Sequence, residues 1–84
     1  MSFYVYLLLC NDKSLYCGYT NNLDSRIYEH NNSPKGAKYT KARRPVTLVY
    51  FEEFDEKVNA LKREFALKKL SRKQKIDLIN GSKI

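Results

Sequence analysis

Residues 15–31, LYCGYTNNLDSRIYEHN, place a tyrosine, an arginine and a histidine around one predicted strand-to-helix corner. Arg26 and His30 are four residues apart, a spacing that puts both side chains on one face of a helix. An arginine there can hold a phosphate with two hydrogen bonds, and a histidine can transfer a proton near neutral pH. Each residue also has an ordinary explanation, because Arg26 can pair with an acid and His30 suits a helix end. Residue type alone does not choose between them.

Glu64 is the candidate metal ligand. Its helical neighbours Ala60, Leu61 and Leu67 are apolar, so its carboxylate is expected beside an apolar face. A partly buried carboxylate is costly unless a cation or hydrogen bonds compensate its charge. Lys68, four residues later, is the ordinary partner, and a Mg²⁺ ion that also binds water and phosphate is the functional one. The sequence favours neither.

The first two predicted strands are rich in tyrosine, and the turn between them decides how these side chains face. The four residues are Tyr4, Tyr6, Tyr16 and Tyr19. In strands, the ring of a tyrosine usually packs against the core while its hydroxyl stays in contact with water. A two-residue turn at 12–13 would pair Tyr6 with Tyr19 and send Tyr16 to the other face. A three-residue turn at 11–13 would put Tyr6 and Tyr16 on the same face. The sequence leaves both registers open, and joint action of Tyr6 and Tyr16 requires the second.

The remaining pattern predicts one domain over residues 1–84 with the order ββαβαα. Strands are expected at residues 3–10, 15–19 and 46–54, helices at 23–30, 55–70 and 71–79, and a basic loop at 35–45. Asp55 and Ser71 are the expected caps of the second and third helices, and Gly81 lies beyond the last. This order indicates an α/β (α+β) fold in which three helices flank a three-stranded antiparallel sheet.

The net charge of +7 is concentrated in the second half of the chain. Residues 1–34 carry two basic and three acidic side chains, so residues 35–84 carry a net charge of +8. Clustered positive charge indicates a polyanionic partner, although a solvated surface has the same composition. The candidate nucleic-acid contacts in the basic loop are Lys35, Lys38, Tyr39, Lys41, Arg43 and Arg44, with Tyr39 stacking on a base. A second group of basic residues either extends this surface or forms the water-exposed face of its helices: Lys62, Lys69, Arg72, Lys73 and Lys75.

Other classes of protein are disfavoured. The longest apolar run, residues 3–10, is far shorter than the roughly 20 residues of a membrane helix, and no signal-peptide pattern accompanies it. A cytoplasmic protein without a membrane partner is therefore expected. Cys10 and Cys17 lie in apolar stretches, and one histidine cannot complete a tetrahedral zinc site with them.

Taken together, these residues resemble the GIY-YIG nuclease domain over nearly the whole chain. The resemblance is carried by YVY at 4–6, YCG at 16–18, Arg26, His30 and the glutamate of REFALKKL. Tyr6 precedes Tyr16 by ten residues, and Tyr16 precedes Arg26 by ten, which is the family spacing. The stretch GAKYTKARRPVTLVY is also similar to small standalone bacterial members.

The resemblance implies an endonuclease that hydrolyses DNA, favoured over RNA, and selects substrate structure rather than base sequence, as in DNA repair or recombination. Glu64 would bind one Mg²⁺ or Mn²⁺ ion, and Arg26 would clamp the phosphate. Tyr6 or Tyr16 would activate water, and His30 would tune the proton transfer; a tyrosine near pKa 10 needs a nearby cation to act as a base. The alternatives are a catalytically weak or inactive DNA- or RNA-binding module on the same fold, and a protein-interaction adaptor that uses the aromatic hairpin. The oligomeric state stays open.

Overall fold

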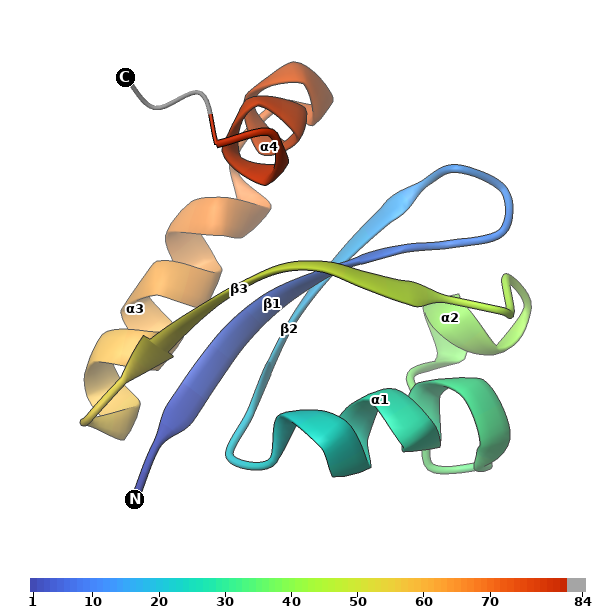
Figure 1. Ribbon diagram of the computed structural model, residues 1–84, viewed down its shortest axis with the longest axis horizontal. Coiled ribbons are helices and arrows are strands. Elements are labelled where there is room, and N and C mark those ends of the chain that lie inside the picture. Colours follow the sequence, from blue (N-terminus) through green and yellow to red (C-terminus); the bar gives the residue numbers. More distant parts are fainter. Residues whose placement is uncertain (82–84) are drawn as a thin grey trace.

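The computed structural model describes residues 1–81, and residues 82–84 of the expected domain lie outside that part. The elements in chain order are β1 (Phe3–Leu9), β2 (Leu15–Thr20), α1 (Leu23–Asn32), α2 (Lys38–Lys41), β3 (Thr47–Phe54), α3 (Lys57–Lys68) and α4 (Arg72–Ile79). The strands form one antiparallel sheet in the order β2-β1-β3 (Figure 1). The predicted sheet and its flanking helices are confirmed, and α2 is a short addition within the basic loop.

The hairpin between β1 and β2 has the three-residue turn. Leu8 pairs with Tyr16 and Tyr6 pairs with Gly18, so Tyr6 and Tyr16 share one face of the sheet. Lys13 has a φ of 73°, and Asp12 accepts a hydrogen bond from the Ser14 backbone N–H at 3.0 Å. These local features select the register that the sequence left open.

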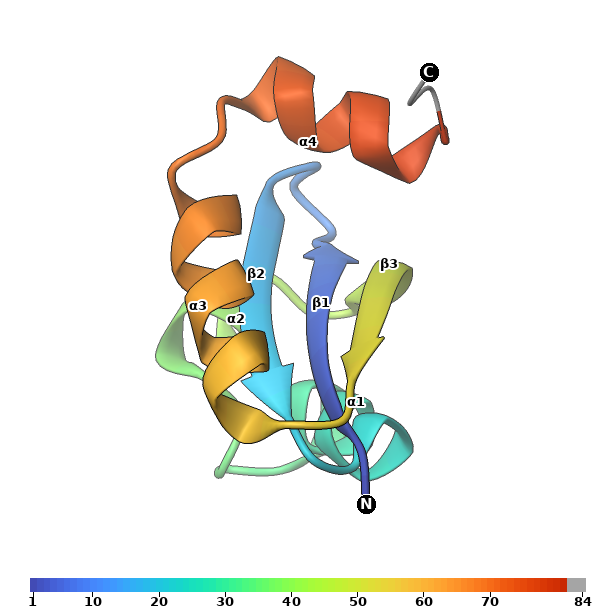
Figure 2. The ribbon, with the colours of Figure 1, turned by 90° about the vertical axis from the view of Figure 1, so that its left-hand side faces the viewer.

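The two faces of the sheet carry different helices (Figure 2). On one face, α1 places Leu23 and Ile27 against a buried cluster that includes Tyr6 and Leu8. On the opposite face, Ala60 and Leu67 of α3 pack against Val5, Leu7 and Cys17 of the sheet, and α4 adds Leu78 and Ile79 to this cluster. Both cysteines are buried and free, as small apolar residues would be. Because α1 and α3 lie on opposite faces, residues from both helices can meet only along an edge of the sheet.

The N-caps of α1, α3 and α4 show which of the predicted helix starts are correct. Ser71 caps α4 in a capping box with Gln74, as expected. Asn22 caps α1 by accepting a hydrogen bond from the Ser25 backbone N–H at 3.1 Å. The prediction that Asp55 caps the second helix was wrong, because α3 begins at Lys57, its N-cap is Glu56, and no side chain caps it.

Two contacts fix the orientation of α3. Arg63 donates to both carboxylate oxygens of Glu52 on β3, at 2.9 Å and 3.0 Å, a geometry that holds the helix in rotation as well as position. The next residue, Glu64, lies on the β2 side, where its carbonyl oxygen is 4.0 Å from the Cys17 sulfur. Within residues 1–81, no helix is long and apolar enough to cross a membrane.

Candidate active site at the β2 edge

A chain of hydrogen bonds links Tyr6, His30 and Thr40 below the surface. The Tyr6 hydroxyl is 2.8 Å from His30 Nε2, and His30 Nδ1 is 2.8 Å from Thr40 Oγ1. All three side chains are almost completely buried. They come from β1, α1 and α2, so the fold brings together three segments that are well separated in sequence.

Thr40 determines which ring nitrogen of His30 carries the proton. Its hydroxyl donates to the Ala37 carbonyl oxygen at 3.0 Å, so the same oxygen must accept a hydrogen bond from His30 Nδ1–H. His30 Nε2 then has a free lone pair, and the Tyr6 hydroxyl donates to it. The site therefore contains a neutral imidazole that is ready to receive the phenolic proton.

Burial controls the protonation of both groups. The pKa of His30 is lowered from 6.5 to about 4, mainly by burial and also by the nearby Arg26 guanidinium. Burial also raises the pKa of Tyr6 well above its ordinary value, and a hydrogen bond from Arg26 offsets only part of this effect. The sequence argument expected a nearby cation to lower the pKa of a tyrosine, so that its phenolate form is available at neutral pH. For Tyr6 the net shift is in the opposite direction, so it is a neutral phenol at neutral pH.

Arg26 lies at the rim of this buried chain. Its Nη1 donates to the Glu29 carboxylate at 2.8 Å and to the Lys35 carbonyl oxygen at 3.0 Å. The side chain keeps 26% of its surface exposed. The ordinary ion pair is therefore present, yet the guanidinium also reaches the Tyr6 hydroxyl and remains open to solvent. The ordinary interpretation of Arg26, an ion pair with an acid, is therefore confirmed, and its contact with a phosphate stays a prediction.

Tyr16 extends the site toward the basic loop. Its ring packs edge-on against His30, with the ring centroids 5.2 Å apart, and stacks on Tyr39 at 5.9 Å. The Arg43 guanidinium covers the other side of Tyr39 at 3.9 Å from the ring centroid. Tyr6 and Tyr16 are thus brought together around one histidine.

Glu64 approaches the same strand from the opposite face of the sheet. Its side chain is 19% exposed and pairs with Lys68 at 3.3 Å. Its charge helps to raise the pKa of the Cys17 thiol to about 11, after burial as the main cause, and it contributes to the raised pKa of Tyr6. The Glu64 charge is therefore felt on both faces of the sheet, and a joint role with Tyr6, Arg26 and His30 stays a prediction.

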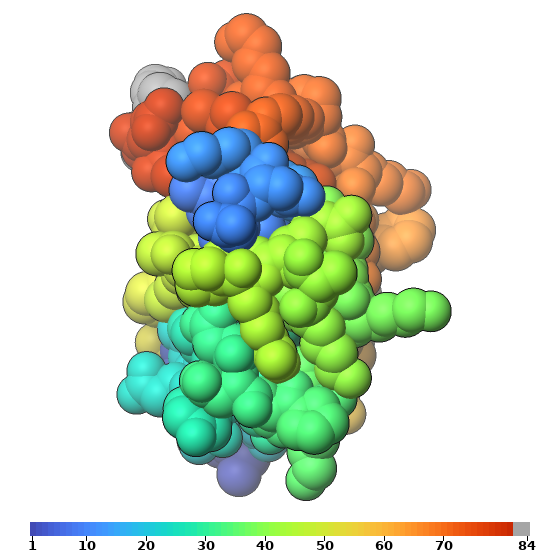
Figure 3. Space-filling model, turned by 90° about the vertical axis from the view of Figure 1, so that its right-hand side faces the viewer, coloured from blue at the N-terminus to red at the C-terminus, as the bar shows by residue number. Residues whose placement is uncertain are grey.

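The basic loop is divided between exposed and structural cations. Lys35, Lys38 and Lys41 are exposed. The loop as a whole, in green to yellow-green, covers the middle of one face between the hairpin turn in blue and α1 in teal (Figure 3). Arg44 instead donates to three carbonyl oxygens at the end of α1, those of Glu29, His30 and Ser33. Its guanidinium therefore closes the helix, and we leave Arg44 out of the surface proposed below.

Comparison with known proteins places this arrangement in a family. The family model described as the GIY-YIG catalytic domain matches residues 2–77. The chain belongs to this family. The UPF0213 protein of Clostridium perfringens (strain 13 / Type A) is 57% identical to it over 81 residues, which cover 96% of this chain and 86% of that protein. The UPF0213 protein of Staphylococcus haemolyticus (strain JCSC1435) is 55% identical over 76 residues, 90% of this chain and 92% of the relative.

A solved structure agrees with the GIY-YIG assignment. The solution NMR structure of the UPF0213 protein BH0048 from Bacillus halodurans is 45% identical, covers 98% of this chain and 86% of its own, and superposes with a TM-score of 0.63. A second NMR structure, of a protein from E. faecalis, is 47% identical, covers 96% and 85% of the two chains, and has a TM-score of 0.65. The resemblance drawn from the sequence is confirmed.

The metal ion expected in a GIY-YIG nuclease was tested against the side chains at the β2 edge. Within residues 1–81, no group of three or more histidine, cysteine or acidic side chains is placed to hold a metal. Glu64 is partly exposed, and its partner Lys68 is 55% exposed and attached by a long flexible side chain. Mg²⁺ commonly takes one carboxylate, with waters and substrate phosphate completing its coordination. Glu64 offers one such carboxylate, and in this structure its partner is the Lys68 ammonium.

Two residues that position this GIY-YIG site were missed by sequence reasoning. Thr40 carried no signal, because a threonine within a basic loop is expected at the surface. Gly18 did carry one, since glycine within a strand often marks a close approach. A Cβ atom at Gly18 would overlap the end of the Tyr6 side chain. The glycine of YCG thus makes room for the tyrosine of YVY.

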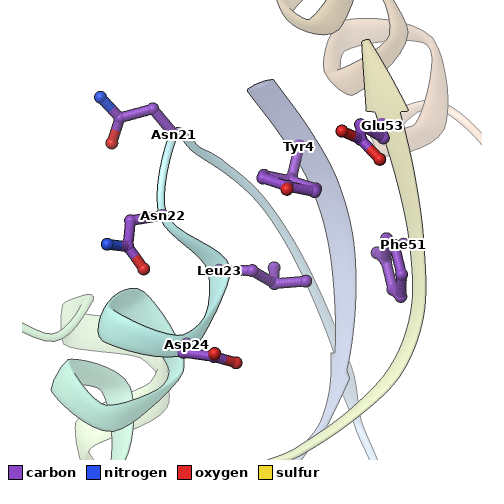
Figure 4. Close-up of a pocket in the computed structure, with 7 residues that line it drawn as sticks. All are labelled: Tyr4, Asn21, Asn22, Leu23, Asp24, Phe51 and Glu53. Carbon is purple, nitrogen blue, oxygen red and sulfur yellow. The ribbon is translucent and has the colours of Figure 1, made fainter. Parts of the chain in front are cut away.

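A separate hollow of about 400 Å³ lies on the α1 face, between the sheet and the start of α1 (Figure 4). Leu23 points toward Tyr4, and Phe51 lies beside them on β3. None of the five candidate catalytic residues lines this hollow. The candidate site is therefore separate from this hollow.

Proposed function

We propose that the chain is a cytoplasmic, divalent-metal-dependent endonuclease that hydrolyses DNA. It would select its substrate by nucleic-acid structure rather than by base sequence. The proposal is carried by the hydrogen bonds that link Tyr6, His30 and Thr40 beside Arg26, in a protein of the GIY-YIG family. This arrangement supplies a proton acceptor and a cation at one point of the surface. Hydrolysis of a phosphodiester needs both.

In the proposed reaction, the Tyr6 oxygen takes a proton from the attacking water while its own proton passes to His30 Nε2. The hydroxide so formed attacks phosphorus, and the leaving oxygen departs with the electron pair of the broken P–O bond and takes a proton from solvent. The raised pKa of Tyr6 fits this relay, because it uses a neutral phenol and needs no phenolate. A bound phosphate would raise the low pKa of His30 by placing negative charge nearby.

Arg26 and Glu64 would share the stabilisation of charge. The Arg26 guanidinium would offset the negative charge that develops on the phosphate. Glu64 would hold the Mg²⁺ or Mn²⁺ ion, which when bound polarises the phosphate as a Lewis acid. Lys35, Lys38 and Lys41 would contact backbone phosphates, and Tyr39 with its Arg43 partner would meet a base.

A cleavage assay tests the proposal. The purified protein is incubated with single-stranded, duplex and branched DNA and with RNA, with Mg²⁺, with Mn²⁺ and with a chelator. We expect metal-dependent products on DNA, and losses of 10²-fold or more for Tyr6→Phe, Arg26→Ala and Glu64→Gln in proteins that still fold. Glu53→Gln, an exposed acid on β3, is the matched control and should cleave normally.

Two results would contradict this mechanism. Full cleavage by both Arg26→Ala and Glu64→Gln would remove it. Salt-sensitive binding of DNA or RNA by the wild-type protein, without products under any metal condition, would instead support the binding-module alternative.

A further inference from the structure

The outer face of α3 carries an apolar stripe that no part of the described chain covers. Val58, Leu61 and Phe65 are three and four residues apart, so they form one row along the helix. Phe65 is 64% exposed, and the other two are also exposed. The buried core uses Ala60 and Leu67 of the same helix, and this row is not part of that core. An exposed phenylalanine beside a candidate catalytic residue calls for a binding role.

The orientation of α3 places this stripe next to the candidate site. The Glu64 carbonyl oxygen lies 4.0 Å from the Cys17 sulfur on β2, and the Glu64 charge acts on that thiol, while Arg63 pairs with Glu52 on β3. At about 100° per residue, Leu61 and Phe65 follow Glu64 by about 60° and 100° around the helix, in the direction away from Arg63. They therefore lie on the β2 side of α3. Figure 2 shows α3 running beside β2 on this side of the sheet.

The charges around the stripe match a polyanion. Glu64 is the one acid of α3, while lysines surround the row on both sides: Lys57, Lys62, Lys68 and Lys69. The Lys69 ammonium lies 4.2 Å from the centroid of the Phe65 ring. Tyr39 and Arg43 form a similar pair of aromatic ring and cation beyond Tyr16. An exposed aromatic ring in contact with a cation thus lies on each side of the β2 edge.

We propose that Phe65, with Leu61 and Lys69, binds unpaired nucleotides of the substrate strand next to the scissile phosphate. The inference rests on the proposed function, since it continues the same nucleic-acid surface across Glu64 onto α3. A base in an intact duplex is already stacked on both sides, so an exposed ring can stack only on a base that has left the duplex. The substrate class is therefore single-stranded DNA, or a branch or flap that exposes such nucleotides.

Binding without cleavage tests this inference. Fluorescence anisotropy with labelled oligothymidylate and with a blunt-ended duplex, in chelator, gives dissociation constants for the wild type and for Phe65→Ala. We expect Phe65→Ala to weaken oligothymidylate binding about tenfold, with a much smaller effect on the duplex, and Phe65→Trp to restore it. The matched control is Phe51→Ala, which removes a 49% exposed ring from the α1 face and should bind normally.

The outcomes separate this inference from the proposed function. Unchanged oligothymidylate binding by Phe65→Ala overturns the inference while leaving cleavage untouched. An equal loss on the duplex overturns the assignment to unpaired nucleotides. A further outcome is that sedimentation shows the wild type to be a dimer and Phe65→Ala a monomer. If DNA affinity is then the same in both proteins, the stripe is a self-association surface and the inference is overturned. If the wild type binds oligothymidylate but never cleaves, the proposed function fails and this inference stands.

Discussion

Acidification should destabilise the protein through His30, its one histidine. The ordinary pKa of 6.5 describes the unfolded chain, and burial lowers the pKa of the folded imidazole to about 4. Between these values the unfolded chain binds more protons than the folded one, so stability falls as the pH falls from 6.5 toward 4. At pH 5 the unfolded histidine is almost fully protonated and the folded one only about one-tenth so, which corresponds to a loss of about 2 kcal/mol relative to pH 7.

Two measurements test this. NMR can follow the single imidazole directly, and we expect a midpoint near pH 4 and ¹⁵N shifts typical of the Nδ1–H tautomer. Denaturant unfolding gives the free energy of unfolding at pH 7 and at pH 5. Between these pH values it should fall by about 2 kcal/mol more in the wild type than in His30→Gln, in which all the other titrating groups remain. An imidazole that titrates near 6.5, or equal pH dependence in the two proteins, would refute the buried neutral histidine.

Three further substitutions probe the supports of the site and the fold. Gly18→Ala should lower stability by about 1–3 kcal/mol in denaturant titration and abolish cleavage, because the new methyl group displaces the Tyr6 hydroxyl from His30; normal activity would show that Tyr6 can move freely. Thr40→Val should cost about 1–3 kcal/mol by leaving His30 Nδ1–H unpaired and should slow cleavage, with Thr40→Ser restoring both, whereas an active Thr40→Val protein would mean that the tautomer is not fixed by Thr40. Ser71→Ala should lower the free energy of unfolding by about 1 kcal/mol through loss of the α4 cap and leave cleavage unchanged; a change in rate would connect α4 to the site.

The sequence predicted those features that depend on short-range patterns. Ser71 and Gln74 form a capping box whose two partners are three residues apart, so local reading found the start of α4. The spacing of Arg26 and His30 likewise placed both on one helix face. Asp55 failed as a cap because the chain continues in a non-helical conformation to Glu56 before α3 begins.

Features that depend on distant segments were beyond sequence reasoning. The hairpin register is selected by the turn at Asp12–Ser14, whose alternatives differ little in the sequence pattern. The role of Thr40 depends on a short helix that brings it against α1, and a loop pattern does not reveal this. Burial also changed the expected direction of the Tyr6 pKa shift, because sequence shows the cations near a group but not the water that it loses.

The β1–β2 turn is also bound to the basic loop. Asp12 accepts a hydrogen bond from Arg43 Nε at 2.9 Å, and the Asn11 backbone N–H donates to the Arg43 carbonyl oxygen at 2.9 Å. Hairpin tips are usually permissive places for inserting residues or attaching a tag. Here a lengthened tip would pull on the segment that carries Thr40, so peptide insertions at this exposed turn would disturb proton transfer at a distance. Fusions of this protein are better made at a chain end than at its most accessible loop.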